Sequence, residues 1–92
     1  MTREEVLSKA QTCVCGDREQ DYGTPEKNFN TIALLWSVYV QNLGRGYFEP
    51  RDVAAMLALL KIARIASGKA KDDNWVDLAG YAACGGELEN NE

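Results

Sequence analysis

The sequence of 92 residues predicts a single all-α domain, a four-helix bundle joined by short connections. Three observations support this fold class. Apolar side chains recur at intervals of three and four residues, capping residues or prolines precede the apolar segments, and no segment alternates as a half-buried β-strand does. The predicted helices span residues 3–15, 25–43, 50–67 and 74–88 approximately, and residues 1–92 are expected to form one domain.

The first predicted helix begins with a capping box, in which Thr2 is followed three residues later by Glu5. Gly16 is expected to end this helix as a left-handed cap. Because the segment is short and only moderately apolar, we expect it to pack on the outside of the bundle. Its apolar stripe consists of Val6, Ala10, Cys13 and Val14.

The second predicted helix has the most regular pattern in the chain. Thr24 is placed to cap it, and Pro25 occupies the first turn, where the missing N–H costs nothing. Gly44 and Gly46 follow the last apolar residue and end the helix. Over four turns one apolar face is formed by Phe29, Ile32, Ala33, Trp36, Tyr39, Val40 and Leu43.

The third predicted helix starts at Pro50, and the negative charge of Asp52 in its first turn is favourably placed against the positive end of the helix dipole. Every residue from Val53 to Leu60 is apolar, which predicts a helix that is buried on all sides. Three short partner helices cannot cover so much apolar surface. We therefore expect a homo-oligomer, a dimer or a higher even-numbered assembly, whose sites can lie between subunits.

The fourth predicted helix follows the capping residues 72–74, and the residues after Leu88 are expected to fray. Its many alanines and glycines allow close approach of another helix. The residues expected to pack are Trp75, Leu78, Ala79, Ala82 and Ala83.

Composition excludes several classes of function. A net charge of −4 argues against binding to duplex nucleic acid, which needs a basic surface. The longest apolar run is much shorter than the ~20 residues needed to span a membrane, and the N-terminus does not resemble a signal peptide, so we expect a cytoplasmic protein. With no histidine and three cysteines, Ser-His and Cys-His catalysis is excluded, and the thiols are expected to be reduced.

The polar segment 17–23 is the first candidate for a ligand site. In a binding loop, Arg18 would contact a phosphate and Tyr22 would stack on a base. Asp17 or Asp21 would hold a metal ion or a sugar hydroxyl. In the alternative interpretation the segment is a connector, with Asp17 bonded to local backbone and Tyr22 covering the end of the bundle. The segment is long for a helix connection, which favours binding.

Other candidate residues lie on the predicted helices. Asn28 flanks the apolar face of the second helix and could reach the loop. Lys61 and Arg64, three residues apart, would face a phosphate; alternatively they form a surface stripe or pair with acidic residues of neighbouring helices.

Acidic and aromatic residues repeat at intervals of four on the last predicted helix, namely Asp73, Asp77 and Tyr81. The two carboxylates can hold Mg²⁺ beside a phosphate, and Mg²⁺ is the one cofactor that the residues suggest. Alternatively, Asp73 is a cap, Asp77 interacts with the helix dipole, and Tyr81 lies at the edge of the core.

Several blocks in a fixed order resemble a family of small helical proteins encoded by bacteriophages and prophages, a domain of unknown function. The blocks are Gly-Asp-Arg to Asp-Tyr-Gly at 16–23, Asn-Phe at 28–29, Leu-Trp-Ser at 35–37, Asp-Val-Ala to Ala-Arg at 52–64 and Trp-Val-Asp-Leu-Ala-Gly-Tyr-Ala-Ala at 75–83. The resemblance implies a phage origin and action inside the bacterial host cell.

A looser resemblance is to the MazG-like all-α nucleoside triphosphate pyrophosphohydrolases and to phage nucleotide-modification-associated domains. Those proteins are helical oligomers whose acidic residues hold Mg²⁺ against the phosphates of a nucleotide. The pair Asp73 and Asp77 resembles their later acidic motif. The earlier Glu-x-x-Glu pair is missing, since residues 31–43 contain no carboxylate.

Three functions are therefore considered. In the first, the chain binds a phosphorylated nucleotide, cyclic or linear, and sequesters this signal of host defence without chemistry. In the second, it is a Mg²⁺-dependent nucleoside triphosphate pyrophosphohydrolase. In the third, it is a small acidic inhibitor that binds a host protein. The incomplete acidic motif favours the first.

Overall fold

The computed structural model describes residues 1–17, 23–68 and 72–90. These residues form four α-helices and one short π-helix, and none of them lies in a strand, so the all-α class and the single domain are confirmed. The elements are α1 (Arg3–Thr12), η1 (Cys13–Asp17), α3 (Pro25–Gln41), α4 (Pro50–Ser67) and α5 (Asp72–Asn90).

The capping residues act as the sequence predicts. The Thr2 hydroxyl accepts a hydrogen bond from the Glu5 amide at 3.1 Å, and the Thr24 hydroxyl accepts one from the Lys27 amide at 3.4 Å. Both α3 and α4 begin with proline. The observed bounds agree with the prediction for α4, end two residues early for α3 and extend further at both ends for α5.

The end of the first helix was predicted wrongly. The chain does not reverse at Gly16, because α1 runs directly into η1, whose wider turns carry the helical path through the glycine. Among the described residues, positive φ angles occur only at Gly23 and Gly44, and Gly16 does not adopt one. Gly44, in the connection after α3, is the position where the left-handed conformation is used.

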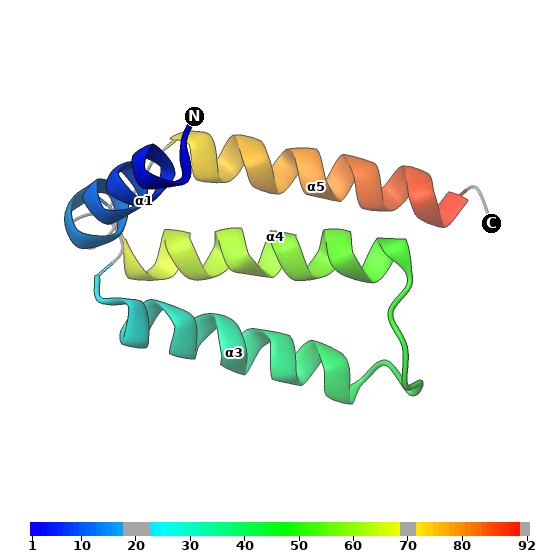
Figure 1. Ribbon diagram of the computed structural model, residues 1–92. Helices are drawn as coiled ribbons and strands as arrows, with labels where there is room; N and C mark the ends of the chain where they lie inside the picture. The colour runs from blue at the N-terminus through cyan, green and yellow to red at the C-terminus, as the bar shows by residue number, and fades with distance from the viewer. Residues whose placement is uncertain (18–22, 69–71, 91–92) are drawn as a thin grey trace.

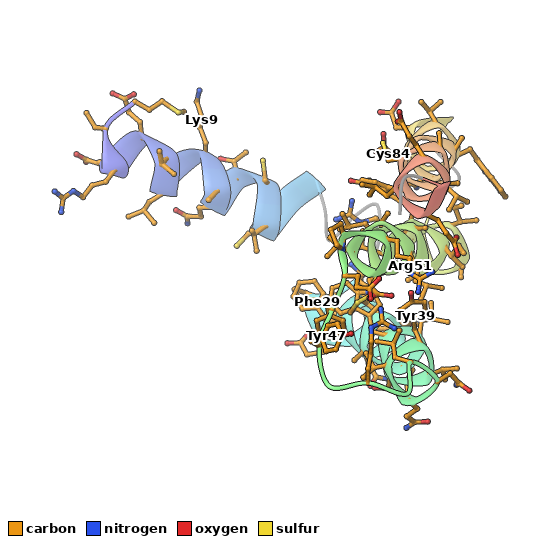
Figure 2. The ribbon with its side chains drawn as sticks, turned by 90° about the vertical axis from the view of Figure 1, so that its right-hand side faces the viewer. Lys9, Phe29, Tyr39, Tyr47, Arg51 and Cys84 are labelled. Carbon is orange, nitrogen blue, oxygen red and sulfur yellow. The ribbon has the colours of Figure 1, made fainter. Side chains whose placement is uncertain are left out.

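Three helices lie side by side in one layer, with α4 between α3 and α5 (Figure 1). Neighbouring helices in this layer are antiparallel. α1 does not close the layer into a four-helix bundle: it projects away from the other three helices (Figure 2), and none of its residues is buried. The expected packing of the stripe Val6, Ala10, Cys13 and Val14 is therefore absent within this chain, since all four are exposed.

The hydrophobic core of this open layer is small. Among the described residues, the buried apolar side chains are Ile32, Ala54 and Ala63. The run Val53–Leu60 was expected to be buried on all sides, but only Ala54 in it is buried, because α4 has neighbours on two sides and not on its faces. Phe29 and Trp75, expected in the core, are also exposed, at 63% and 57%.

Small residues and one indole hold the layer together. A Cβ atom added to Gly85 of α5 would lie only 3.2 Å from the Cβ atom of Ala54 in α4, so these two helices approach closely. Between α3 and α4, the half-buried indole of Trp36 donates a hydrogen bond to the carbonyl oxygen of Met56 at 2.7 Å. Across the described ranges, we find no helix with both the length and the apolar character needed to cross a bilayer.

Candidate functional site

Buried polar side chains gather at one end of the layer, where α3 and α5 begin and α4 ends (Figure 1). We call this cluster the polar end. Asn28, Lys61 and Asn74 are 8%, 9% and 1% exposed. Nζ of Lys61 lies 2.8 Å from Oδ2 of Asp77. The cluster consists of Asn28 from α3, Lys61 and Arg64 from α4, and Asn74 and Asp77 from α5.

Two amide atoms of the polar end are buried and have no hydrogen-bond partner among the described residues. They are Oδ1 of Asn28 and Nδ2 of Asn74. A buried polar atom left unpaired costs about 1–3 kcal/mol, so a folded domain with so small a core does not retain two of them without a reason. Such atoms mark positions where ordered water or a bound molecule would complete the hydrogen bonding.

The electrostatics of the polar end combine charges of both signs. The positive dipole ends of α3 and α5 lie here, and helix N-termini favour anions. Lys61 adds a buried ammonium group that uses one of its three donors on Asp77. Arg64 is half-buried one turn further along α4. Asp73, in the first turns of α5, is exposed.

The sequence-predicted site residues are distributed unevenly in the structure. Lys61 and Asp77 form an ion pair between α4 and α5, and Asn28 and Arg64 lie at the same end of the layer. Tyr81, one turn after Asp77, lines the groove described below. Arg18, Asp21 and Tyr22 lie outside the described residues, as does the side chain of Asp17, whose backbone ends η1.

The predicted Mg²⁺ site rests on Asp73 and Asp77. Within the ranges that the structure describes, histidine, cysteine and acidic side chains do not gather in groups of three. Asp77 also has the ammonium group of Lys61 as its neighbour, in a position where a metal ion would otherwise balance its charge. These two carboxylates could hold a cation only together with ligands from elsewhere.

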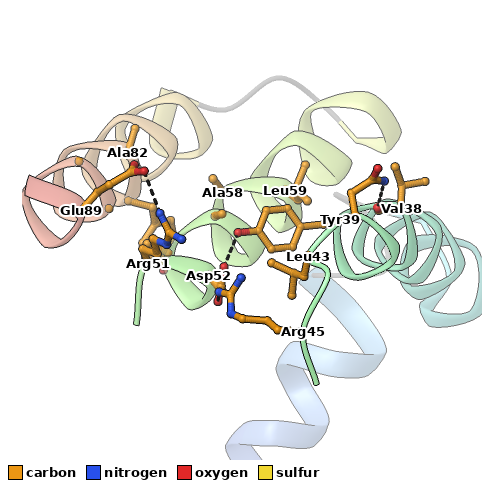
Figure 3. Close-up of a pocket in the computed structure, with 16 residues that line it drawn as sticks. Val38, Tyr39, Leu43, Arg45, Arg51, Asp52, Ala58, Leu59, Ala82 and Glu89 are labelled. Carbon is orange, nitrogen blue, oxygen red and sulfur yellow. Dashed lines mark hydrogen bonds and ion pairs between the residues drawn. The ribbon is translucent and has the colours of Figure 1, made fainter. Parts of the chain in front are cut away.

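A groove of about 810 Å³ crosses one face of the layer, between α3, α4 and α5 (Figure 3). Its floor consists largely of alanines and glycines, including Ala55, Ala58, Ala82 and Gly86. This groove was not predicted from the sequence, because the groove depends on small residues from two helices being brought side by side.

A network of charged side chains borders one end of the groove, centred on Asp52 (Figure 3). Asp52 is 1% exposed; its Oδ1 accepts a hydrogen bond from the Tyr39 hydroxyl at 2.6 Å, and its Oδ2 accepts from the Glu49 amide at 2.7 Å. Arg45 also donates to Oδ2, and its guanidinium lies over the ring of Tyr47.

These partners shift the pKa values of Asp52 and Tyr39. The hydrogen bond from Tyr39, then that from the Glu49 amide, then the contact with Arg45, hold the pKa of Asp52 at about 2, below its ordinary value of 3.8. The same hydrogen bond, together with burial, raises the pKa of Tyr39. Sequence reasoning assigned Asp52 only to the helix dipole. The signal it missed is an arginine between two glycines, followed at short distance by two acidic residues.

Comparison with known proteins places this chain in a family. The profile of a domain of unknown function, DUF6378, matches residues 5–89. The chain belongs to the DUF6378 family. It is 40% identical over 81 residues to the Gene 55 protein of Mycobacterium phage D29 and 43% identical over 77 residues to the Gene 55 protein of Mycobacterium phage L5.

These two alignments cover 88% and 84% of this chain but 51% and 47% of the phage proteins, so the chain spans about half the length of the curated relatives it matches. No solved structure matches it. The residues of the polar end, the groove and the Asp52 network all lie within the part of this chain that the DUF6378 profile matches. Since both relatives are encoded by phages, the expected likeness to a phage-encoded family of unknown function is confirmed.

Proposed function

We propose that this DUF6378 domain binds a phosphorylated nucleotide at the polar end and holds it without chemical change. The observation that carries the proposal is the pair of buried amides, Asn28 and Asn74, each with an atom that has no hydrogen-bond partner within the part of the chain that the structure describes. The buried ammonium group of Lys61 lies on the helix between them. Together these groups form a site with built-in polarity in a chain that otherwise buries very little.

The unpaired atoms favour a ligand that carries both acceptors and donors. Nδ2 of Asn74 and the remaining donors of Lys61 suit phosphate oxygens, which the dipole ends of α3 and α5 also favour. Oδ1 of Asn28 is an acceptor and needs an N–H or O–H group. A nucleotide offers phosphate oxygens together with base amines and sugar hydroxyls, whereas a bare sulfate ion offers acceptors alone.

Sequestration is supported over hydrolysis by the state of the acidic residues. A Mg²⁺-dependent pyrophosphohydrolase needs carboxylates that are available to the metal ion. Asp77 is bound to Lys61, and Asp73 is exposed and belongs to no group of three potential metal ligands among the described residues. A protein that holds its nucleotide intact needs only the binding groups.

The phage relatives suggest the biological setting of this binding. A phage-encoded protein that captures a phosphorylated nucleotide, cyclic or linear, would remove a signal of host defence from the infected cell. Arg18 would add a second cation for the phosphate in this proposal, and Tyr22 a ring for stacking on the base. Both lie in the segment next to the start of α3.

The test is a thermal-shift screen of the purified chain against nucleoside mono- and triphosphates and cyclic nucleotides. A ligand at 100 times its dissociation constant stabilises a folded protein by about 2.7 kcal/mol. That free energy corresponds to a rise in Tm of about 10–20 °C for a domain of this size. Heating the complex should release the nucleotide unchanged.

Two variants locate the site. Lys61→Met removes the buried ammonium and should abolish the shift, while Lys9→Met removes an exposed ammonium from α1 and should leave it unchanged. Circular dichroism establishes that both variants keep their helices. If the chain releases pyrophosphate from a nucleotide in the presence of Mg²⁺, and Asp77→Asn loses this activity, then the chain hydrolyses its nucleotide and the sequestration proposal is wrong. If no nucleotide produces a shift, the proposal is wrong and the third function, binding to a host protein, takes its place.

A further inference from the structure

The surface of the chain is too large for a monomer of its mass. A folded monomer of 10.2 kDa is expected to expose about 5300 Å². This chain exposes 6726 Å², an excess of roughly 1400 Å². Its radius of gyration, 15.4 Å, likewise exceeds the roughly 12 Å expected for a compact domain of this length. The open helical layer and the projecting α1 both contribute.

The excess is larger than the area that a stable interface requires of one partner. A standard protein–protein interface buries about 800 Å² on each partner. The groove face of the layer is open to a partner, because α1 leaves it uncovered: α1 projects on the other side of the layer from Arg51, which lines the groove (Figure 2). The lining of the groove is mainly apolar, with charged side chains at one end. At the rim, Arg51 already has Glu89 as its ion-pair partner, 2.8 Å away, so no lone charge opposes burial there.

The groove face carries a projecting part and a hollow part next to each other. Val38 of α3 stands at the edge of the groove and is 61% exposed, and Leu34, one turn earlier on the same side of the helix, is exposed to the same extent. Beside this ridge lies the floor of alanines and glycines, including Ala58 and Ala82. A surface with its own ridge beside its own groove is complementary to itself under a two-fold rotation.

We infer that two copies of this chain associate through their groove faces, with the α3 ridge of each copy lying in the groove of the other. The small floor residues let the helices of the two layers approach closely, as Gly85 and Ala54 do within one copy. The dimer encloses apolar residues of the groove face, including Val38, that a single layer leaves exposed. It needs no nucleotide and does not depend on the polar end.

The inference is tested by sedimentation equilibrium of the full chain without nucleotide, over a series of concentrations. The chain offers a matched pair of valines. Val38 is 61% exposed and lines the groove; Val76 is 66% exposed and lies on the side of α5 away from α4. Because both are mostly exposed, aspartate at either position should leave the helices of one copy intact, which circular dichroism verifies.

We expect a dimer mass for the wild-type chain and for Val76→Asp. In Val38→Asp the dissociation constant should rise by at least about 100-fold, since the two-fold axis brings two carboxylates into one apolar interface. Leu34→Asp should act in the same way. A monomer mass for the wild-type chain up to about 100 μM would overturn the inference. A dimer that persists unchanged in both Val38→Asp and Leu34→Asp would also overturn it, because the contact would then lie elsewhere.

Discussion

Two glycines in the last helix offer a direct test of how α5 packs on α4. Gly80 and Gly85 both lie inside α5, and an added Cβ atom would meet nothing within 4 Å at Gly80. Replacing a glycine inside a helix with alanine gains about 0.8–1.0 kcal/mol in helix propensity. Gly80→Ala should therefore increase the free energy of unfolding by that amount, which raises Tm by about 4–8 °C.

At Gly85 the same gain is opposed by a close contact. The new methyl group would lie 3.2 Å from the Cβ atom of Ala54, tighter than an ordinary van der Waals contact, and Ala54 has no rotatable side chain that could move aside. Overpacking of this kind costs about 1–3 kcal/mol. The net effect of Gly85→Ala is thus a loss of about 0–2 kcal/mol, and its Tm should lie at least about 4 °C below that of Gly80→Ala.

The measurement is thermal unfolding followed by circular dichroism at one protein concentration, because association makes Tm depend on concentration. The double variant Ala54→Gly with Gly85→Ala moves the methyl group from one helix to the other and relieves the contact. It should be more stable than the sum of the two single changes predicts. If Gly85→Ala stabilises the chain as much as Gly80→Ala does, then α5 is not seated on α4 at Ala54, and the reasoning fails.

Two further predictions concern charged groups. In the fold the pKa of Asp52 is lowered from 3.8 to about 2, so the stability it contributes is complete above pH 3.8 and is lost as the pH falls towards 2. Tyr39→Phe removes the largest cause of that shift and should move the acid-unfolding midpoint to higher pH; an unchanged midpoint would contradict this account. The ion pair of Arg51 and Glu89 is partly exposed, and a double-mutant cycle should give a coupling of at most about 1 kcal/mol. A coupling twice as large would mean that the pair is buried in the protein as it exists in solution.

Local sequence signals predicted the secondary structure well, and they predicted the starts of the first three helices best; the fourth begins two residues before its predicted start. The hydroxyl groups of Thr2 and Thr24 cap their helices because a cap needs only a donor three residues away along the same chain. The end of the first helix was missed at Gly16, where glycine permits a left-handed turn without requiring one. A permissive residue predicts an end less well than a capping side chain predicts a beginning.

For the candidate site too, local sequence signals predicted some features, and contacts between distant segments decided the others. The spacing of Lys61 and Arg64 on one helix, and of Asp73 and Asp77 on another, indicated which faces of these helices carry the polar groups. That Lys61 and Asp77 form an ion pair depends on the antiparallel contact of α4 and α5. Burial depends even more on distant partners. The sequence assigned Asp52 only to the helix dipole, and its burial was not predicted, because Tyr39 and Arg45 from the preceding helix and connection close over it.

The sequence by itself determined the helical class, the places where the helices begin and the residue types available for binding an anion. These follow from interactions between residues a few positions apart. Only the tertiary structure decided that three helices form an open layer, that Asn28 and Asn74 are buried with unpaired atoms, and that alanines from two helices form a groove. The physical reason is that burial is a property of a residue's neighbours in space, and those neighbours come from segments that periodicity within one helix does not relate.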